Sequence, residues 1–272
     1  MSAHILVGTA GWSYRDWEGI VYPVSLKKTE HPAAYLAHYF DVIEINSSFY
    51  GHIRPEVGKL WCRKVAEVNP RFRFTAKLNR AFTHSPNAVL EPTSAATLLP
   101  NPDDEALAKQ GYDAIAGEGR LGALLIQFPV SFRNTNENRA YLESLLERFA
   151  GYPQVVEVRH ASWNNEGILR YFAEKGVAFC NIDQPLLGRS LALPSTPLLG
   201  SATSASTAAT TTSGSTPTVA TTATTISTRR RSWRAGRSAS RTWPRRLRSP
   251  SSSPTTTLRA RPRSTPCSSS TP

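Results

Sequence analysis

The chain has 272 residues, 32 Lys and Arg against 20 Asp and Glu, and a net charge of +12, a length that suits one large domain or two small ones. The positive excess lies in residues 193–272, which hold 12 Arg, 37 Ser or Thr and no Asp, Glu or Lys, so that residues 1–192 hold 20 basic and 20 acidic side chains. Three cysteines argue against a disulfide framework, and neither a signal peptide nor a long apolar span is visible, so we expect a cytoplasmic protein with no membrane segment.

Short apolar runs alternate with segments of helical periodicity through residues 5–182. The pattern predicts strands at residues 5–8, 42–46, 72–78, 121–128, 155–159 and 177–182. It predicts helices at residues 29–40, 55–68, 136–149 and 167–175. Residues 79–119 are less regular, and we expect a long loop region there with one short helix near 104–110.

Strands that alternate with helices predict a parallel sheet covered by helices. Six such units fit either an open doubly wound sheet or an unfinished barrel. The first predicted strand leads into Gly8-Thr9-Ala10-Gly11, which does not match the glycine pattern of dinucleotide-binding folds, and this weakens the dinucleotide-fold alternative. Residues 193–272 lack apolar periodicity, so we expect this tail to be largely disordered and to add no strand.

The predicted strand at residues 42–46 is the centre of the pattern. Its β-branched apolar residues suit a strand buried on both faces. Glu44 and Asn46 share one side of this strand because strand side chains alternate. Barrels of this class carry their chemistry at the C-terminal ends of the strands. Glu44 is therefore a candidate functional carboxylate, and the alternative is a buried structural ion pair.

Other polar residues fall at the ends of the later strands, and we expect them at the same end of the barrel, which is called the mouth below. They are Lys77, Gln127, Glu157, Arg159, His160, Asn181 and Asp183. The candidates for acid–base catalysis are Glu44, Glu157, Asp183 and His160. The same residue types suit a metal, but no compact metal motif is present, so the sequence assigns no metal. The alternatives are a buried Glu157–Arg159 ion pair and an ordinary loop histidine at His160.

Aromatic residues gather in the loops after the first two strands: Trp12, Tyr14, Trp17, Phe49 and Tyr50. We expect Trp12, Tyr14 and Tyr50 to stack on a sugar or a base of a ligand. The alternative is a packed hydrophobic lid, which is the more common role of such residues.

These motifs resemble the YecE-like family, known as domain of unknown function 72. The matching positions are residues 8–14, 17, 22–23, 42–50, 74, 77, 122, 125–129, 157–160, 162–163, 181 and 183. The resemblance covers about residues 5–192 and implies a (β/α)₈-like barrel. It implies no particular reaction, and it supports the polar residues at the barrel mouth only as a candidate site. The expected fold is therefore an α/β, TIM-like barrel that is incomplete here, with six strands.

The tail departs from this family, and a shift of the reading frame accounts for the departure. If the codons after about Ala192 are read one base late, each Ser becomes Phe, Leu, Ile or Val, and each Thr becomes Tyr, His, Asn or Asp. Residues 201–212 can then encode V-G-Y-V-R-L-H-G-R-N-Y-D, which resembles the family's missing seventh strand. We therefore expect a truncated barrel at 1–192 and an out-of-frame tail at 193–272. The alternatives are a natural Ser/Thr/Pro-rich linker and a basic arm that binds nucleic acid.

Two functions remain open. The first is an enzyme that acts on a small polar or phosphorylated ligand, or on a nucleic-acid fragment, with Glu44 or Glu157 as base and with Lys77 and Arg159 holding an anion. The second is a non-catalytic module that binds a small molecule or a nucleic acid at the same mouth. The cofactor stays unassigned under both hypotheses.

Overall fold

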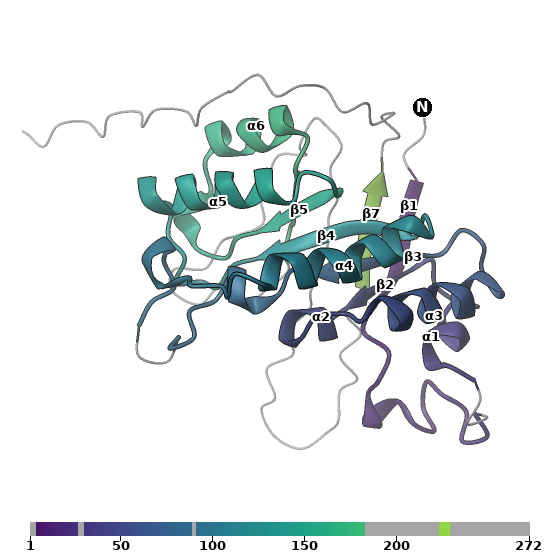
Figure 1. The fold of residues 1–272 in the computed structure, drawn as a ribbon. Coiled ribbons are helices and arrows are strands. Elements are labelled where there is room, and N and C mark those ends of the chain that lie inside the picture. Colours follow the sequence, from purple (N-terminus) through teal and green to yellow (C-terminus); the bar gives the residue numbers. More distant parts are fainter. Residues whose placement is uncertain (1–3, 27–29, 89–90, 183–222, 229–272) are drawn as a thin grey trace, which may run out of the picture.

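A computed structural model of the chain describes residues 4–26, 30–88, 91–182 and 223–228 (Figure 1). These residues form one sheet in the order β6-β5-β4-β3-β2-β1-β7. The strands are β1 (His4–Ala10), β2 (Val42–Ile45), β3 (Arg73–Lys77), β4 (Leu121–Gln127), β5 (Gln154–Glu157), β6 (Ala178–Phe179) and β7 (Ala223–Thr228). The first six are parallel, each beside the next in the chain, and they curl into a half-barrel, which confirms the predicted incomplete barrel.

Helices connect the parallel strands. They are α1 (Pro32–Leu36), α2 (Ser47–Tyr50), α3 (Pro55–Ala66), α4 (Asp104–Gly117), α5 (Asn136–Arg148) and α6 (Glu166–Lys175). Sequence-local signals set their ends: the Thr135 hydroxyl accepts a hydrogen bond from the backbone N–H of Asn138 at the start of α5, and α6 ends at Gly176, whose φ of 72° suits glycine. No helix in the described ranges is long and apolar enough to cross a membrane.

The strand side chains divide into two layers because they alternate in direction. Ile43, Phe74 and Leu124 belong to the large core between the sheet and the helices. The neighbouring residues in sequence, such as Ala123 and Leu125, belong to a smaller apolar cluster on the inner side of the half-barrel. Burial of each large apolar side chain in these layers contributes about 1.5–3 kcal/mol to stability. The inner side is therefore apolar at mid-strand on β4 to β6 and carries the polar residues Glu44 and Thr75 on β2 and β3.

Three local predictions are wrong. Helix α4 extends from Asp104 to Gly117, although the sequence predicts a long loop region with only a short helix there. The prediction was too short because two glycines weaken the helical pattern of this segment. Helix α1 covers only Pro32–Leu36 of the predicted helix 29–40. The Ser-Ser-Phe-Tyr segment forms the single-turn helix α2 instead of a loop, and the Ser48 hydroxyl fixes that turn by donating to the carbonyl groups of Ile45 and Lys77.

The tail contributes one strand to the sheet, which corrects the expectation that it adds none. Strand β7 pairs antiparallel with β1, with His4 opposite Thr228 and Thr9 opposite Ala223. Figure 1 shows β7 beside β1, at the opposite end of the strand order from β6. Thr and Ile are β-branched and suit an extended strand, even in a polar segment. This strand covers the β1 edge without closing the barrel, and the rest of residues 193–272 lies outside the described ranges.

Candidate functional site

The first part of the candidate site is an ion pair at the ends of β2 and β3. The Lys77 Nζ lies 3.3 Å from the Glu44 Oε1, and the Glu44 side chain is 7 % exposed. Burial raises the pKa of Glu44, because the charged carboxylate loses solvation; the positive charge of Lys77 lowers that pKa and the negative charge of Glu157 raises it. The net direction is upward, so Glu44 holds a proton more readily than an exposed glutamate does.

The second part is a hydrogen-bonded cluster around Glu157. Gln127 is in register with Glu157 on the neighbouring strand and donates from Nε2 to Oε1 at 2.5 Å. Arg159 donates to the same oxygen from Nε and from Nη2, each at 2.8 Å. The other carboxylate oxygen lies 3.8 Å from the Cys180 sulfur. Glu157 is 1 % exposed, so this carboxylate is buried with its cation, as the ion-pair alternative for Glu157 and Arg159 predicts.

Both clusters lie on the inner side of the half-barrel. Glu44 is in register with Thr75, and Thr75 is in register with Ala123 of the inner apolar cluster. Glu157 follows Val155 of the same cluster by two residues, which places it on the same side of its strand. The charge of Glu157 acts on Glu44, although β3 and β4 lie between their strands. Asp183, the fourth residue predicted for acid–base chemistry, lies outside the described residues.

Several buried polar atoms in this region have no hydrogen-bond partner. They are the Oδ1 of Asn46, the Oγ1 of Thr75 and the Oδ1 of Asn181. Thr75 is only 3 % exposed and lies between the positions of Glu44 and Lys77 on the inner side. Most buried polar groups in proteins are hydrogen-bonded, because an unpaired one costs about 1–3 kcal/mol. Thr75 and Asn46 are therefore available to hydrogen-bond a bound molecule.

The aromatic residues divide between two locations. The ring of Trp12 packs edge-on against Trp61, with centroids 5.0 Å apart, and against Phe74, at 6.2 Å, on the helix-covered side of the sheet. The Tyr14 hydroxyl donates to the backbone carbonyl of Ala10. Tyr50, in contrast, is 74 % exposed on α2. The packing of Trp12 is that of the hydrophobic-lid alternative, whereas the Tyr50 ring meets the Phe49 ring edge-on at 5.0 Å and lies at the surface.

His160 lines a separate groove of about 770 Å³, formed by residues 92–96 and by parts of 130–138. Its Nδ1 lies 2.8 Å from the Ser162 hydroxyl oxygen and accepts from the Ser162 backbone N–H at 3.1 Å, which is a helix-capping arrangement. Within the described ranges, no three His, Cys, Asp or Glu side chains come together as a metal-binding group.

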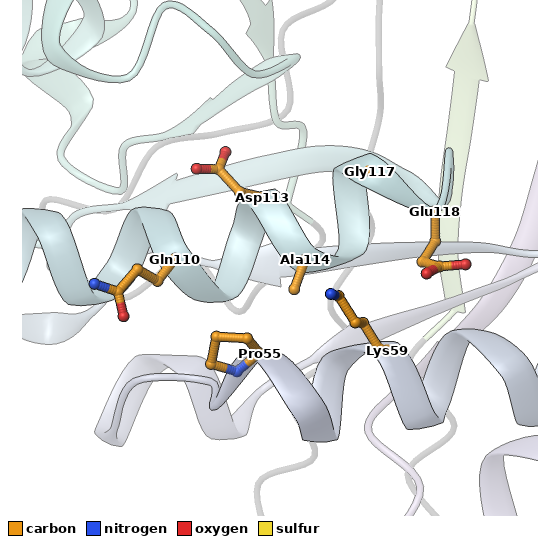
Figure 2. Close-up of a pocket in the computed structure, with 7 residues that line it drawn as sticks. All are labelled: Pro55, Lys59, Gln110, Asp113, Ala114, Gly117 and Glu118. Carbon is orange, nitrogen blue, oxygen red and sulfur yellow. The ribbon is translucent and has the colours of Figure 1, made fainter.

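A second hollow of about 630 Å³ lies between α3 and α4, in the outer helical layer (Figure 2). Figure 2 shows the Lys59 side chain extending toward α4, while the Asp113 carboxylate points away from the hollow. Asp113 accepts a hydrogen bond from the Tyr152 hydroxyl at 2.7 Å. The hollow is therefore a feature of helix packing, separate from the polar inner side of the half-barrel.

His84, in the loop after β3, is a partly buried histidine that the sequence patterns did not single out. Its ring meets the Phe49 ring edge-on at 4.9 Å, and its Nδ1 lies 2.9 Å from the Thr83 Oγ1. Burial, together with the positive charges of Arg80, Arg159 and Lys77, lowers the pKa of His84 to about 4. The residue falls in the segment without regular periodicity, so the sequence offered no signal to separate it from an ordinary loop histidine. Thr75 was missed because it looks like any strand threonine.

The comparisons with known proteins agree with the half-barrel. A DUF72 family protein of Thermotoga maritima aligns with a TM-score of 0.57 and 26 % identity, covering 74 % of this chain and 73 % of that one. A DUF72 family protein of Enterococcus faecalis aligns with a TM-score of 0.57 and 18 % identity, covering 73 % and 69 %, and shows the fold alone. No curated protein matches. The family model described as "Protein of unknown function DUF72" matches residues 6–252, which extends past residue 192, where the sequence motifs stop, and the chain accordingly belongs to the DUF72 family.

Proposed function

We propose that the protein is an enzyme that binds a small polar ligand, phosphorylated or nucleic-acid-like, on the inner side of the half-barrel at the ends of β2 to β5. The observation that supports this most strongly is the pairing of two buried carboxylates, Glu44 and Glu157, each with its own cation on one side of the sheet. The raised pKa of Glu44 adds to this support, because buried groups with a perturbed pKa often mark functional sites.

Glu44 is the proposed acid–base residue. Its raised pKa favours the neutral carboxyl, which can donate a proton, and the carboxylate form can accept one. Lys77 can leave Glu44 to hold an anionic group, since its side chain is 19 % exposed while the carboxylate is almost fully buried. Arg159 is 34 % exposed and presents further donors beyond those on Glu157. The unpaired Thr75 hydroxyl and Asn46 carbonyl supply neutral hydrogen bonds to the ligand.

A second candidate function is a non-catalytic binding module that uses the same side chains. It is favoured by the Glu157 cluster, in which Gln127 and Arg159 already hold the carboxylate as a structural ion pair would. Tyr50, whose exposed ring lies on α2, is available to stack on a base or a sugar in either case. We place the protein in the cytoplasm, because both described cysteines, Cys62 and Cys180, are buried free thiols that suit a reducing compartment.

The two functions are separated by turnover. A panel of phosphorylated and polar small molecules is screened for binding by thermal shift, and each binder is then tested for conversion. The Glu44→Gln variant should retain binding and lose about 100-fold or more in rate if Glu44 acts as acid or base. Glu56→Gln, at an exposed carboxylate on α3, is the matched control and should change neither. A binder that is converted equally fast by Glu44→Gln excludes the catalytic role.

A further inference from the structure

The groove that His160 lines, of about 770 Å³, lies at the C-terminal end of the sheet. Its lining comes from three segments, each of which follows a parallel strand: residues 92–96 after β3, parts of 130–138 after β4, and His160 after β5. In α/β barrels the loops after the strands build the ligand sites, and small-molecule sites measure about 300–1,000 Å³. The groove therefore has the place and the size of a small-molecule site.

Hydrogen bonds tie the first two of these segments together. Asn138, which is 3 % exposed, accepts from the Ala95 backbone N–H at 2.7 Å and donates to the Arg133 carbonyl at 2.8 Å. The Ser131 hydroxyl oxygen accepts from the Thr93 backbone N–H at 3.1 Å. The walls of the groove are thus held in place before any ligand binds, which lowers the entropy cost of binding.

The third segment is tied to the second in the same way. The Ser162 hydroxyl oxygen accepts from the Asn134 backbone N–H at 2.9 Å and lies 2.8 Å from the His160 Nδ1. The Trp163 indole N–H donates to the Phe132 carbonyl at 2.8 Å, and the two rings are stacked, with centroids 5.7 Å apart. These contacts fix the His160 ring at the groove.

The groove adjoins the hydrogen-bonded cluster around Glu157. Arg159 and His160 are consecutive residues: Arg159 donates to the Glu157 carboxylate at 2.8 Å, and His160 lines the groove. On the neighbouring strand, Gln127 donates to the same carboxylate at 2.5 Å, and Val130, three residues later, lines the groove. Three residues of chain span at most about 11 Å. One ligand can therefore contact Arg159 and lie in the groove.

The side chains of the groove suit a flat ring with polar edges and an attached anion. Its apolar side chains are those of Pro92, Ala95, Ala96 and Val130. Ser131 and Arg133 supply hydrogen-bond donors, and Glu137 supplies an acceptor. Two cations, Arg133 and Arg159, lie in or beside the groove against the single lining carboxylate of Glu137, and this excess of positive charge favours an anionic ligand.

Building on the proposed polar ligand site, we propose that the groove is the base-binding part of that site and that the ligand is a nucleoside monophosphate. A nucleobase has apolar faces for the groove walls and donor and acceptor edges for Arg133 and Glu137. The ribose crosses the end of β5. Arg159 binds the phosphate, because its side chain is 34 % exposed and has donors beyond those on Glu157.

The test is calorimetric titration of the full chain with the 5′-monophosphates of adenosine, guanosine, cytidine and uridine. Ribose 5-phosphate, which lacks the base, and phenyl phosphate, which lacks its polar edges, are the reference probes. Ala96→Trp and Val130→Trp fill the groove from two different loops, at positions whose side chains are exposed. Leu99→Trp, at a 79 % exposed position outside the groove lining, is the matched control. Thermal melts show that each variant folds.

We expect at least one nucleotide to bind about tenfold or more tightly than ribose 5-phosphate, because the base adds contacts. Ala96→Trp and Val130→Trp should lose this gain and keep the affinity for ribose 5-phosphate, Leu99→Trp should keep both, and Arg159→Gln should weaken both.

Three results would overturn the inference while leaving the polar ligand site in place: ribose 5-phosphate binding as tightly as every nucleotide, phenyl phosphate binding as tightly as the best nucleotide, or a nucleotide gain that persists in both groove variants. Binding of none of the phosphorylated probes would remove the phosphorylated ligand of the proposed function together with this inference.

Discussion

Glu44 carries a carboxyl group whose charged form is disfavoured by burial in the fold. Because its folded pKa is raised above the unfolded value, its contribution to stability is present below the unfolded pKa and is lost as the pH rises through the folded pKa. Glu44→Gln removes the free-energy cost of keeping a charged carboxylate buried above the folded pKa. We expect the variant to gain about 1 kcal/mol relative to wild type at neutral pH and less at acidic pH. Thermal melts of both proteins across this pH range measure it, and a constant difference in Tm would contradict it.

The contribution of His84 to stability depends on pH in the opposite direction. Its folded pKa of about 4 lies below the ordinary 6.5, so its contribution is present above 6.5 and is lost as the pH falls toward 4. Wild type should lose stability over this interval, and His84→Gln should lose less. Denaturant titrations at the two ends of the interval test this, with His38→Gln as control. Parallel loss in wild type and His84→Gln would show that the ring is not held neutral in the fold.

The sequence predicted the site residues that lie on strands better than those that lie in loops. Glu44 and Glu157 interrupt apolar runs, and Lys77 lies on the polar side of an alternating strand, so their common side of the sheet followed from strand geometry. His84 belongs to a loop whose path depends on contacts with Phe49 and Thr83, which no local pattern encodes. His160 lines the groove formed by residues 92–96 and parts of 130–138, and not the inner side of the half-barrel, because its side chain caps the turn that follows it.

At the scale of elements, the contact between α4 and the segment before α3 depends on a glycine. A Cβ at Gly111 would lie 2.5 Å from the backbone oxygen of Ile53, closer than any real contact. Gly111→Ala should therefore destabilise the fold by about 1–3 kcal/mol through overpacking. Gly117→Ala, at the end of the same helix with open space around it, should be neutral or stabilise by up to about 1 kcal/mol. Thermal melts compare the two, and equal effects would contradict this close approach.

The same contact explains an error in the sequence analysis. Helix α4 contains Gly111 and Gly117, which weaken its helical signal, yet Ala108, Tyr112 and Ile115 bury one face of it in the core. Tertiary packing therefore extended the helix beyond the residues whose local preference predicted it. Strand β7 was missed for a related reason: it is polar, and its pairing depends on the edge of β1, a partner distant in the chain.

At the scale of the whole molecule, the half-barrel leaves apolar surface uncovered. Ile5 and Val7 on β1 are 64 % and 44 % exposed, and β6, at the other end of the sheet, has only the two residues Ala178–Phe179. Among the described strands, none pairs with the free edge of β6. Exposed edges and apolar strands promote aggregation.

We propose that the coding sequence has lost its frame near Ala192 and that the restored frame supplies the missing strands. Restoring one base there should give a more soluble protein with a higher Tm and a single cooperative transition, because the free β6 edge becomes paired. Thermal melts and sedimentation of both forms measure this, with the source DNA resequenced. A chain as written that is soluble, monomeric and cooperative, with its frame confirmed by the DNA, would show that the tail is native.

The central claim is that Glu44, Lys77 and Glu157 form one electrostatically coupled site, and the pKa of Glu44 tests it most directly. Carbon-13 NMR of the Glu44 carboxyl is recorded against pH in wild type, Glu157→Gln and Lys77→Met, with exposed Glu56 as internal reference. The account predicts a raised pKa for Glu44 in wild type, a lower one in Glu157→Gln, because a negative neighbour is removed, and a higher one in Lys77→Met, because a positive neighbour is removed. The same pKa for Glu44 in all three proteins would contradict the coupled site.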